Sequence, residues 1–133
     1  MSKCSLKFGD LIWVNFPEQA MAIGSEEKIM EIGHEQSGKR PAICIFNPHD
    51  LGTPRYELIL VAPVTSKVNQ YFIESPLLYP PIPQDPNGLS VTSYVLLDQI
   101  RAIDIRRIVN YNNQLSSTQI AFLRACIKKI LPK

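Results

Sequence analysis

The apolar residues of this chain fall into short runs separated by turn-forming residues, and this pattern constrains the fold more than any other feature. Short runs rich in β-branched and aromatic residues are typical of strands. The run at 56–62 is nearly continuous, which indicates a central strand, and Pro63 is expected to end it. The last two runs are expected to form neighbouring strands. The predicted strands are residues 10–16, 41–46, 56–62, 90–97 and 100–105.

One segment near the C-terminus has the spacing of an amphipathic helix. Ser116 is followed three residues later by Gln119, which predicts an N-terminal capping box. Apolar residues then recur along one face and predict a buried stripe, while three basic residues fall outside it. The stripe consists of Ile120, Leu123, Ile127, Ile130 and Leu131, and the basic residues are Arg124, Lys128 and Lys129.

Two long connections interrupt this pattern. Residues 17–39 are polar and predict a long loop, within which residues 26–32 have the composition of a short helix. Loops of this length in a small domain are usually functional or mobile. Residues 76–86 contain five prolines, which predict an irregular connection with polyproline character. The alternative for this segment is a proline-rich ligand for another domain.

The length and composition of the chain fit one globular unit. Its 133 residues are 45% hydrophobic and 20% charged, which is enough for a core without disulfides, so we expect a single domain over residues 1–133. Short strands followed by a terminal helix predict a mainly β fold with helices. We expect a small, curved antiparallel sheet or barrel that packs against the C-terminal helix.

Charge is distributed unevenly along the chain. Residues 1–100 carry 7 Lys/Arg and 11 Asp/Glu, a net charge of −4, whereas residues 101–133 carry 7 Lys/Arg and 1 Asp/Glu, a net charge of +6. A basic C-terminal third either attracts a polyanion or forms an ordinary solvated face. The charges alone leave both interpretations open.

The cysteines and histidines predict neither disulfides nor a metal site. The three cysteines are far apart and form no CxxC pair, and Cys44 and Cys126 lie within apolar runs, so we expect buried free thiols in a reducing cytoplasm. The two histidines, His34 and His49, have no cysteine near them, so no metal or cofactor is expected. The N-terminus does not read as a signal peptide, and the longest apolar run, 58–64, is too short to cross a bilayer.

Two polar segments next to predicted strands are candidates for a functional site. Residues 33–41 gather an imidazole, a carboxylate, a carboxamide and two cations directly before a strand. Residues 63–67 place two hydroxyls and a cation just past a buried strand. Taken alone, the first segment is also typical of a charged turn, and the second is also typical of an ordinary strand end. Loops on rigid strands are nevertheless where functional sites are usually built.

Four sequence blocks in a fixed order give these segments a specific meaning. Residues 9–16 (GDLIWVNF), 33–41 (GHEQSGKRP), 60–66 (LVAPVTS) and 93–104 (SYVLLDQIRAID) follow one another as in the MazF/PemK toxins of type II toxin–antitoxin systems. The chain resembles this family from Gly9 to the final helix. The resemblance implies an SH3-like or gyrase-poison-like antiparallel barrel with a C-terminal helix, in agreement with the predicted strands.

The resemblance also implies an activity and partners. It implies a metal-independent endoribonuclease that cuts single-stranded RNA at short sequences and thereby inhibits translation and growth. The ribose 2′-hydroxyl attacks the neighbouring phosphate and leaves a 2′,3′-cyclic phosphate and a 5′-hydroxyl. The implied partners are single-stranded RNA, a cognate antitoxin with an acidic disordered segment, and a second copy of the chain in a homodimer. No membrane is involved, and the expected location is the cytoplasm.

Individual roles carry over where the motifs match. Arg40 aligns with the catalytic arginine of the family, and its planar guanidinium suits a phosphate. Thr65 aligns with the catalytic threonine, and His34 matches the histidine treated as base or acid in PemK-like members. Glu35 is the competing base. The expected substrate-binding residues are Glu35, Gln36, Lys39, Ser66, Lys67 and Asp98, of which Asp98 matches a site aspartate of PemK-like members.

Two departures from the family pattern stand beside these matches. PemK-like members have an arginine two positions before the residue that matches Asp98, and this chain has Leu96 there, which removes a proposed acid. The stretch before Gly33 is also longer than is usual for the family. The alternative function is a toxin of the same fold that binds without cutting, as gyrase poisons do, or an inactivated member of the family.

Overall fold

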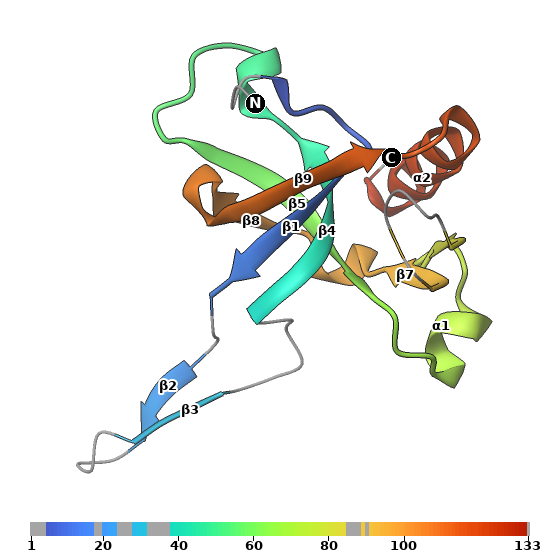
Figure 1. Ribbon diagram of the computed structural model, residues 1–133, viewed down its shortest axis with the longest axis horizontal. Helices are drawn as coiled ribbons and strands as arrows, with labels where there is room; N and C mark the ends of the chain where they lie inside the picture. Colours follow the sequence, from blue (N-terminus) through green and yellow to red (C-terminus); the bar gives the residue numbers. More distant parts are fainter. Residues whose placement is uncertain are drawn as a thin grey trace.

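The structure, a computed structural model, describes residues 5–17, 20–23, 28–31, 38–84, 89 and 91–132. Most strands form one strongly curved antiparallel sheet, in the order β6-β7-β5-β4-β1-β9 with β8 paired to β5 (Figure 1). The strands are β1 (Asp10–Phe16), β2 (Ala20–Ile23), β3 (Lys28–Glu31), β4 (Gly38–Phe46), β5 (Leu58–Thr65), β6 (Pro81–Ile82), β7 (Ser93–Val95), β8 (Arg101–Asp104) and β9 (Ile108–Gln114). The helices are α1 (Gln70–Glu74) and α2 (Ser117–Ile130).

Strand β5 organises the sheet. It pairs with β4 along one edge, and with first β8 and then β7 along the other. The expectation that the strands around 90–97 and 100–105 are neighbours is therefore wrong, because β7 and β8 each pair with a different part of β5. The expectation that Pro63 ends the strand is also wrong. The Pro63 carbonyl accepts from the Leu96 N–H at 2.8 Å, so the missing N–H of Pro63 faces the gap between β8 and β7 and removes no ladder bond.

Both faces of the central sheet are buried. Ile43 of β4 belongs to the core cluster that includes Leu123 and Cys126 of α2. Its neighbours Ala42 and Cys44 point the other way, into a second cluster enclosed by the curl of the sheet. The sheet therefore closes its concave face on itself and covers its other face with α2, which confirms the expected fold class (Figure 1).

The C-terminal helix begins as the sequence predicts and packs over a shorter length than expected. The Ser116 hydroxyl accepts from the Gln119 N–H at 3.2 Å, and the Gln119 side chain accepts from the Ser116 N–H at 3.0 Å, which confirms the capping box. Leu123 and Cys126 are buried, whereas Ile130 and Leu131 are exposed. The buried stripe was thus predicted too long, because the last turn of α2 lies beyond the core cluster.

Gly9 lies against Ile120 in the first turns of α2. Its φ is +91°, and a Cβ at this position would lie 2.7 Å from Cγ1 of Ile120. A side chain would therefore meet both backbone strain and a packed neighbour. Glycine at this position lets the segment before β1 lie against the start of the helix.

Three further expectations need correction. The predicted loop over 17–39 contains a two-stranded ladder, in which β2 pairs with β3, so the short helix predicted over 26–32 is wrong for residues 28–31, and the rest of it lies outside the described residues. A helix of so few residues is unstable by itself, and pairing of two short strands satisfies the backbone instead. Strand β9 was not predicted, because its exposed edge position leaves it polar. Within the proline-rich segment, β6 pairs with β7 at the sheet edge, where proline is tolerated.

No helix in the described part of the chain is long and apolar enough to span a membrane.

Candidate active site

A cavity of about 250 Å³ opens where β4 begins and β5 ends. The charged residues among those that line it are Lys39 and Arg40, and both are cations. A concave site with charges of one sign concentrates ions of the opposite sign, so the cavity suits an anion. The lining residues are Trp13, Lys39, Arg40, Pro41, Val64, Thr65, Ser66, Leu89, Val91 and Ser93.

The strand register explains why Arg40 and Thr65 come together. Ala42 of β4 pairs with Pro63 of β5, and continuing this register by two residues places Arg40 opposite Thr65. Directly opposite residues on antiparallel strands share a face, with their Cβ atoms about 5 Å apart. Arg40 also pairs with Val14 of β1. The guanidinium thus extends from a strand held on both sides rather than from a loop.

Thr65 is a buried polar residue whose hydroxyl oxygen is held by the backbone two residues further along the chain. Its Oγ1 accepts a hydrogen bond from the Lys67 N–H at 3.2 Å. This bond occupies an oxygen lone pair and does not use the hydroxyl hydrogen, which can donate to a bound group. Ser66 lines the cavity next to Thr65, whereas the exposed Lys67 side chain is not among the lining residues.

Comparison with known proteins identifies the chain's relatives. A family model described as "PemK-like, MazF-like toxin of type II toxin-antitoxin system" matches residues 7–131. The chain belongs to this family. No significant match is found among curated protein sequences.

Solved structures of MazF toxins share this fold. The crystal structure of MazF from Deinococcus radiodurans is 26% identical, with a TM-score of 0.64 over 93% of this chain and 94% of that chain. A MazE–MazF crystal structure from the same organism is 25% identical, with a TM-score of 0.60 and 93% of each chain covered. The Mycobacterium tuberculosis toxin MazF-mt6 is 21% identical, with a TM-score of 0.56 over 71% of this chain and 88% of that chain, and shows the fold alone.

Two residues that follow β7, Leu96 and Asp98, are not among the residues that line the cavity of this MazF/PemK toxin. Leu96 is fully buried, and its N–H donates to the Pro63 carbonyl, so this position is part of the core and offers no acid. Asp98 does not line the cavity. Its carboxylate accepts from the Tyr79 hydroxyl at 2.6 Å. This hydrogen bond, which holds the phenol proton, raises the pKa of Tyr79 to about 12.

The other predicted site residues divide into two groups. Lys39 and Ser66 line the cavity beside Arg40 and Thr65. His34, Glu35 and Gln36 lie outside the described residues. Four of the lining residues were not predicted from the sequence. Trp13 alone had a signal, because it alternates with the buried Ile12 and Val14 of β1 and so faces away from the enclosed core. The four residues are Trp13, Leu89, Val91 and Ser93.

The two described cysteines belong to the core. Cys44 and Cys126 are buried free thiols, as expected. Burial raises the pKa of the Cys44 thiol to about 12, so this sulfur is a core atom rather than a nucleophile. Among the described residues, no three His, Cys, Asp or Glu side chains gather into a metal site.

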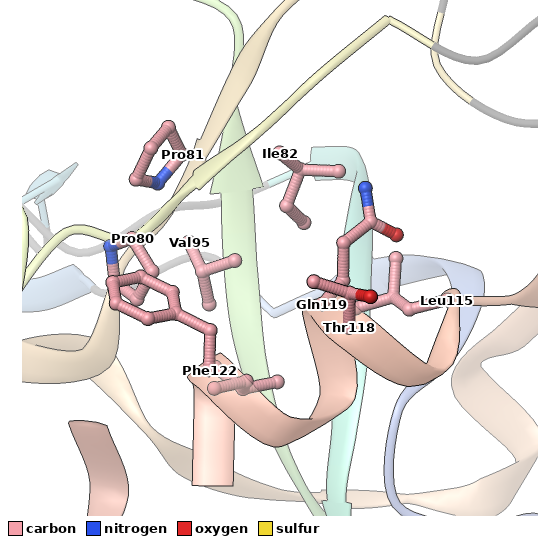
Figure 2. Close-up of a pocket in the computed structure, with 9 residues that line it drawn as sticks. Pro80, Pro81, Ile82, Val95, Leu115, Thr118, Gln119 and Phe122 are labelled. Carbon is pink, nitrogen blue, oxygen red and sulfur yellow. The ribbon is translucent and has the colours of Figure 1, made fainter. Parts of the chain in front are cut away.

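A second cavity, of about 210 Å³, lies between α2 and the β6–β7 edge and is almost entirely apolar. Phe122 of α2 and Pro80, which precedes β6, both line it (Figure 2). No charged residue is among its lining residues, so it suits an apolar group rather than a phosphate. Its other lining residues are Pro81, Ile82, Val95, Leu115, Thr118, Gln119 and Leu123.

Proposed function

We propose that this chain is a toxin with endoribonuclease activity, which cleaves single-stranded RNA at short sequences in the cytoplasm and so stops translation. The observation that carries the proposal is the cavity that Arg40 and Thr65 line together, with cations as its charged residues. A phosphodiester entering it meets a guanidinium, an ammonium and a hydroxyl at once. Membership of the MazF/PemK family supports the same function.

The proposed reaction is an attack within the RNA chain. The ribose 2′-hydroxyl attacks the adjacent phosphorus and the bond to the 5′-oxygen breaks, which leaves a 2′,3′-cyclic phosphate and a 5′-oxygen that takes up a proton from Arg40 or from water. Arg40 stabilises the negative charge that builds up on the non-bridging oxygens. The Thr65 hydroxyl donates to one of these oxygens. We assign removal of the 2′ proton to His34, with Glu35 as the competing base.

The test is cleavage of an unstructured RNA by the purified protein in excess EDTA, with analysis of the product ends. We expect 5′-hydroxyl and 2′,3′-cyclic phosphate ends. Arg40→Ala should lower the rate by about 10²-fold or more. Arg55→Ala is the matched control, because Arg55 is an exposed arginine that does not line the cavity.

The outcomes separate the alternatives. Products with 5′-phosphates, or loss of all cutting in EDTA, would refute the proposed mechanism. Wild-type protein that binds RNA and never cuts it would instead identify a binding toxin of the same fold. Cutting that survives Arg40→Ala unchanged would remove this residue from the reaction.

We further propose that the toxin forms a homodimer and is neutralised by a cognate antitoxin with an acidic disordered segment. The similarity to MazE–MazF complexes supports the antitoxin. Leu115 and most of β5 are buried within the chain and offer no apolar surface to a second copy. Phe122, which lines the apolar cavity, is 42% exposed. Leu131, at the end of α2, is 58% exposed.

A further inference from the structure

Three aromatic rings gather beside the candidate active site. Phe72 comes from α1, Tyr79 from the turn before β6, and Tyr94 from β7. The ring centroids of Phe72 and Tyr79 lie 4.8 Å apart, and those of Phe72 and Tyr94 lie 5.5 Å apart. We call Phe72, Tyr79 and Tyr94 the aromatic cluster.

The aromatic cluster adjoins Thr65 directly. Thr65 pairs with Tyr94 across the β5–β7 ladder, so their side chains share a face of the sheet with Cβ atoms about 5 Å apart. On the other side of Thr65, the β4–β5 register leads to Arg40. Arg40, Thr65 and Tyr94 therefore form a row across three strands. An RNA strand bound along this row would meet a cation, a hydroxyl and then an aromatic ring.

The aromatic cluster is not required as core. None of its three residues belongs to either core cluster of buried residues, and all three are only half-buried. The Tyr79 hydroxyl is held by the Asp98 carboxylate at 2.6 Å, which fixes the orientation of that ring. Rings that are braced at one end and open to solvent are prepared to stack on a flat partner.

We propose that the aromatic cluster is a stacking subsite for one nucleobase next to the phosphate held by Arg40 and Thr65, and that Asp98 is a positioning residue for Tyr79. The proposal rests on the proposed ribonuclease function. Every nucleobase has a π face, and unpaired bases bind proteins largely by stacking on aromatic side chains. The Asp98 carboxylate would repel a phosphate or an acidic peptide at this point, whereas a nucleobase is uncharged.

The test combines changes in the protein with removal of a base. After the cut site is mapped, RNA oligonucleotides are made with a 2′-deoxy sugar at the attacking position, which prevents cleavage, and with an abasic residue at each neighbouring position in turn. Fluorescence anisotropy then gives the affinity of each RNA for wild type, Tyr94→Leu and Tyr94→Phe. Tyr56→Leu is the matched control, because Tyr56 is an exposed tyrosine outside the cavity and the cluster.

We expect Tyr94→Leu to weaken binding of the intact RNA about 10-fold, Tyr94→Phe to recover most of the affinity because it restores the ring, and the control Tyr56→Leu to leave the affinity unchanged. Removing the base at one position should weaken wild-type binding by a similar factor and should have no effect on Tyr94→Leu. Tyr79→Phe and Asp98→Asn should each give a smaller loss, which disappears with the same abasic RNA. The leucine variant keeps an apolar side chain, and thermal unfolding verifies that each variant is folded.

Each result decides the proposal. In one outcome, Tyr94→Leu and base removal each weaken RNA binding with effects that add at every position. That result would overturn the subsite even if the enzyme is active, because the ring would then contact no base. Equal losses for Tyr56→Leu would do the same. A wild-type protein that neither cuts nor binds RNA would remove the proposed function, and the subsite with it. Wild-type cutting with unchanged binding by Tyr94→Leu would remove the subsite alone.

Discussion

At the scale of the residue, the proposed contribution of Thr65 depends on one hydroxyl group. Thr65→Val keeps the branched shape of this buried side chain and removes the hydroxyl, so the strand should survive while the rate of RNA cleavage falls by about 10²-fold or more. Thr65→Ser restores the hydroxyl and should recover most of the rate. Single-turnover cleavage measures the effect, with thermal unfolding as the control for folding. A valine variant with the wild-type rate would assign the phosphate contact to another group.

Gly9 offers a second test at a single position, this time of stability. Gly9→Ala adds a Cβ at a φ of +91° and 2.7 Å from Ile120, and should lower the free energy of unfolding by about 1–3 kcal/mol. Gly52→Ala is the matched control, because its φ is ordinary and nothing lies within 4 Å of the added atom. Urea denaturation of the two variants measures the difference. Equal stability of both would show that the contact between the N-terminal segment and α2 yields easily.

At the scale of the element, the start of α2 shows how a local signal specifies structure. Ser116→Ala removes the hydroxyl that accepts from the Gln119 N–H, and should cost about 1 kcal/mol, or about 4 °C in Tm. Ser117→Ala is the matched control, since Ser117 is the first residue of the helix and is exposed. Thermal unfolding followed by circular dichroism distinguishes them. A loss for Ser117→Ala as large as that for Ser116→Ala would contradict a capping role.

The elements that sequence reasoning predicted correctly are those with local signals. The capping box lies within four residues, and β1 and β4 carry β-branched residues between turn formers. The errors concern partners that the local sequence does not specify. Strand β9 is polar because one edge of it is unpaired in the described sheet, and β7 and β8 are separated because both bind β5. Pro63 continues a strand only because its missing N–H falls at the junction of these two partners.

At the scale of the whole molecule, the site is a product of strand register. The motifs of the sequence named Arg40 and Thr65 through family resemblance, and the β4–β5 ladder explains why two residues far apart in the chain line one cavity. The aromatic cluster had no comparable signal, because its members come from α1, a turn and β7. Only the pairing of Thr65 with Tyr94 brings these aromatic residues beside the proposed phosphate site.

Assembly gives the last prediction. Phe122 is a large apolar residue of α2 that is 42% exposed, and it lines the second cavity, whose surface is almost entirely apolar. A second copy that covers this surface would remove Phe122 from water in a symmetric contact. We therefore expect wild-type protein to be a dimer by light scattering across a micromolar dilution series, and Phe122→Glu to be a folded monomer because a buried, unpaired carboxylate opposes association.

The control for this experiment is Leu51→Glu. Leu51 is 82% exposed and lies outside both α2 and the apolar cavity, so its variant should remain a dimer. A Phe122→Glu protein that stays dimeric would place the interface elsewhere, and a wild-type monomer at micromolar concentration would refute the dimer. Measuring RNA cleavage by the Phe122→Glu monomer then shows whether the Arg40–Thr65 cavity is complete in one copy. Because Arg40 and Thr65 of one chain line the cavity together, we expect the monomer to retain cutting and to lose affinity for long RNA, which would span both copies in the dimer.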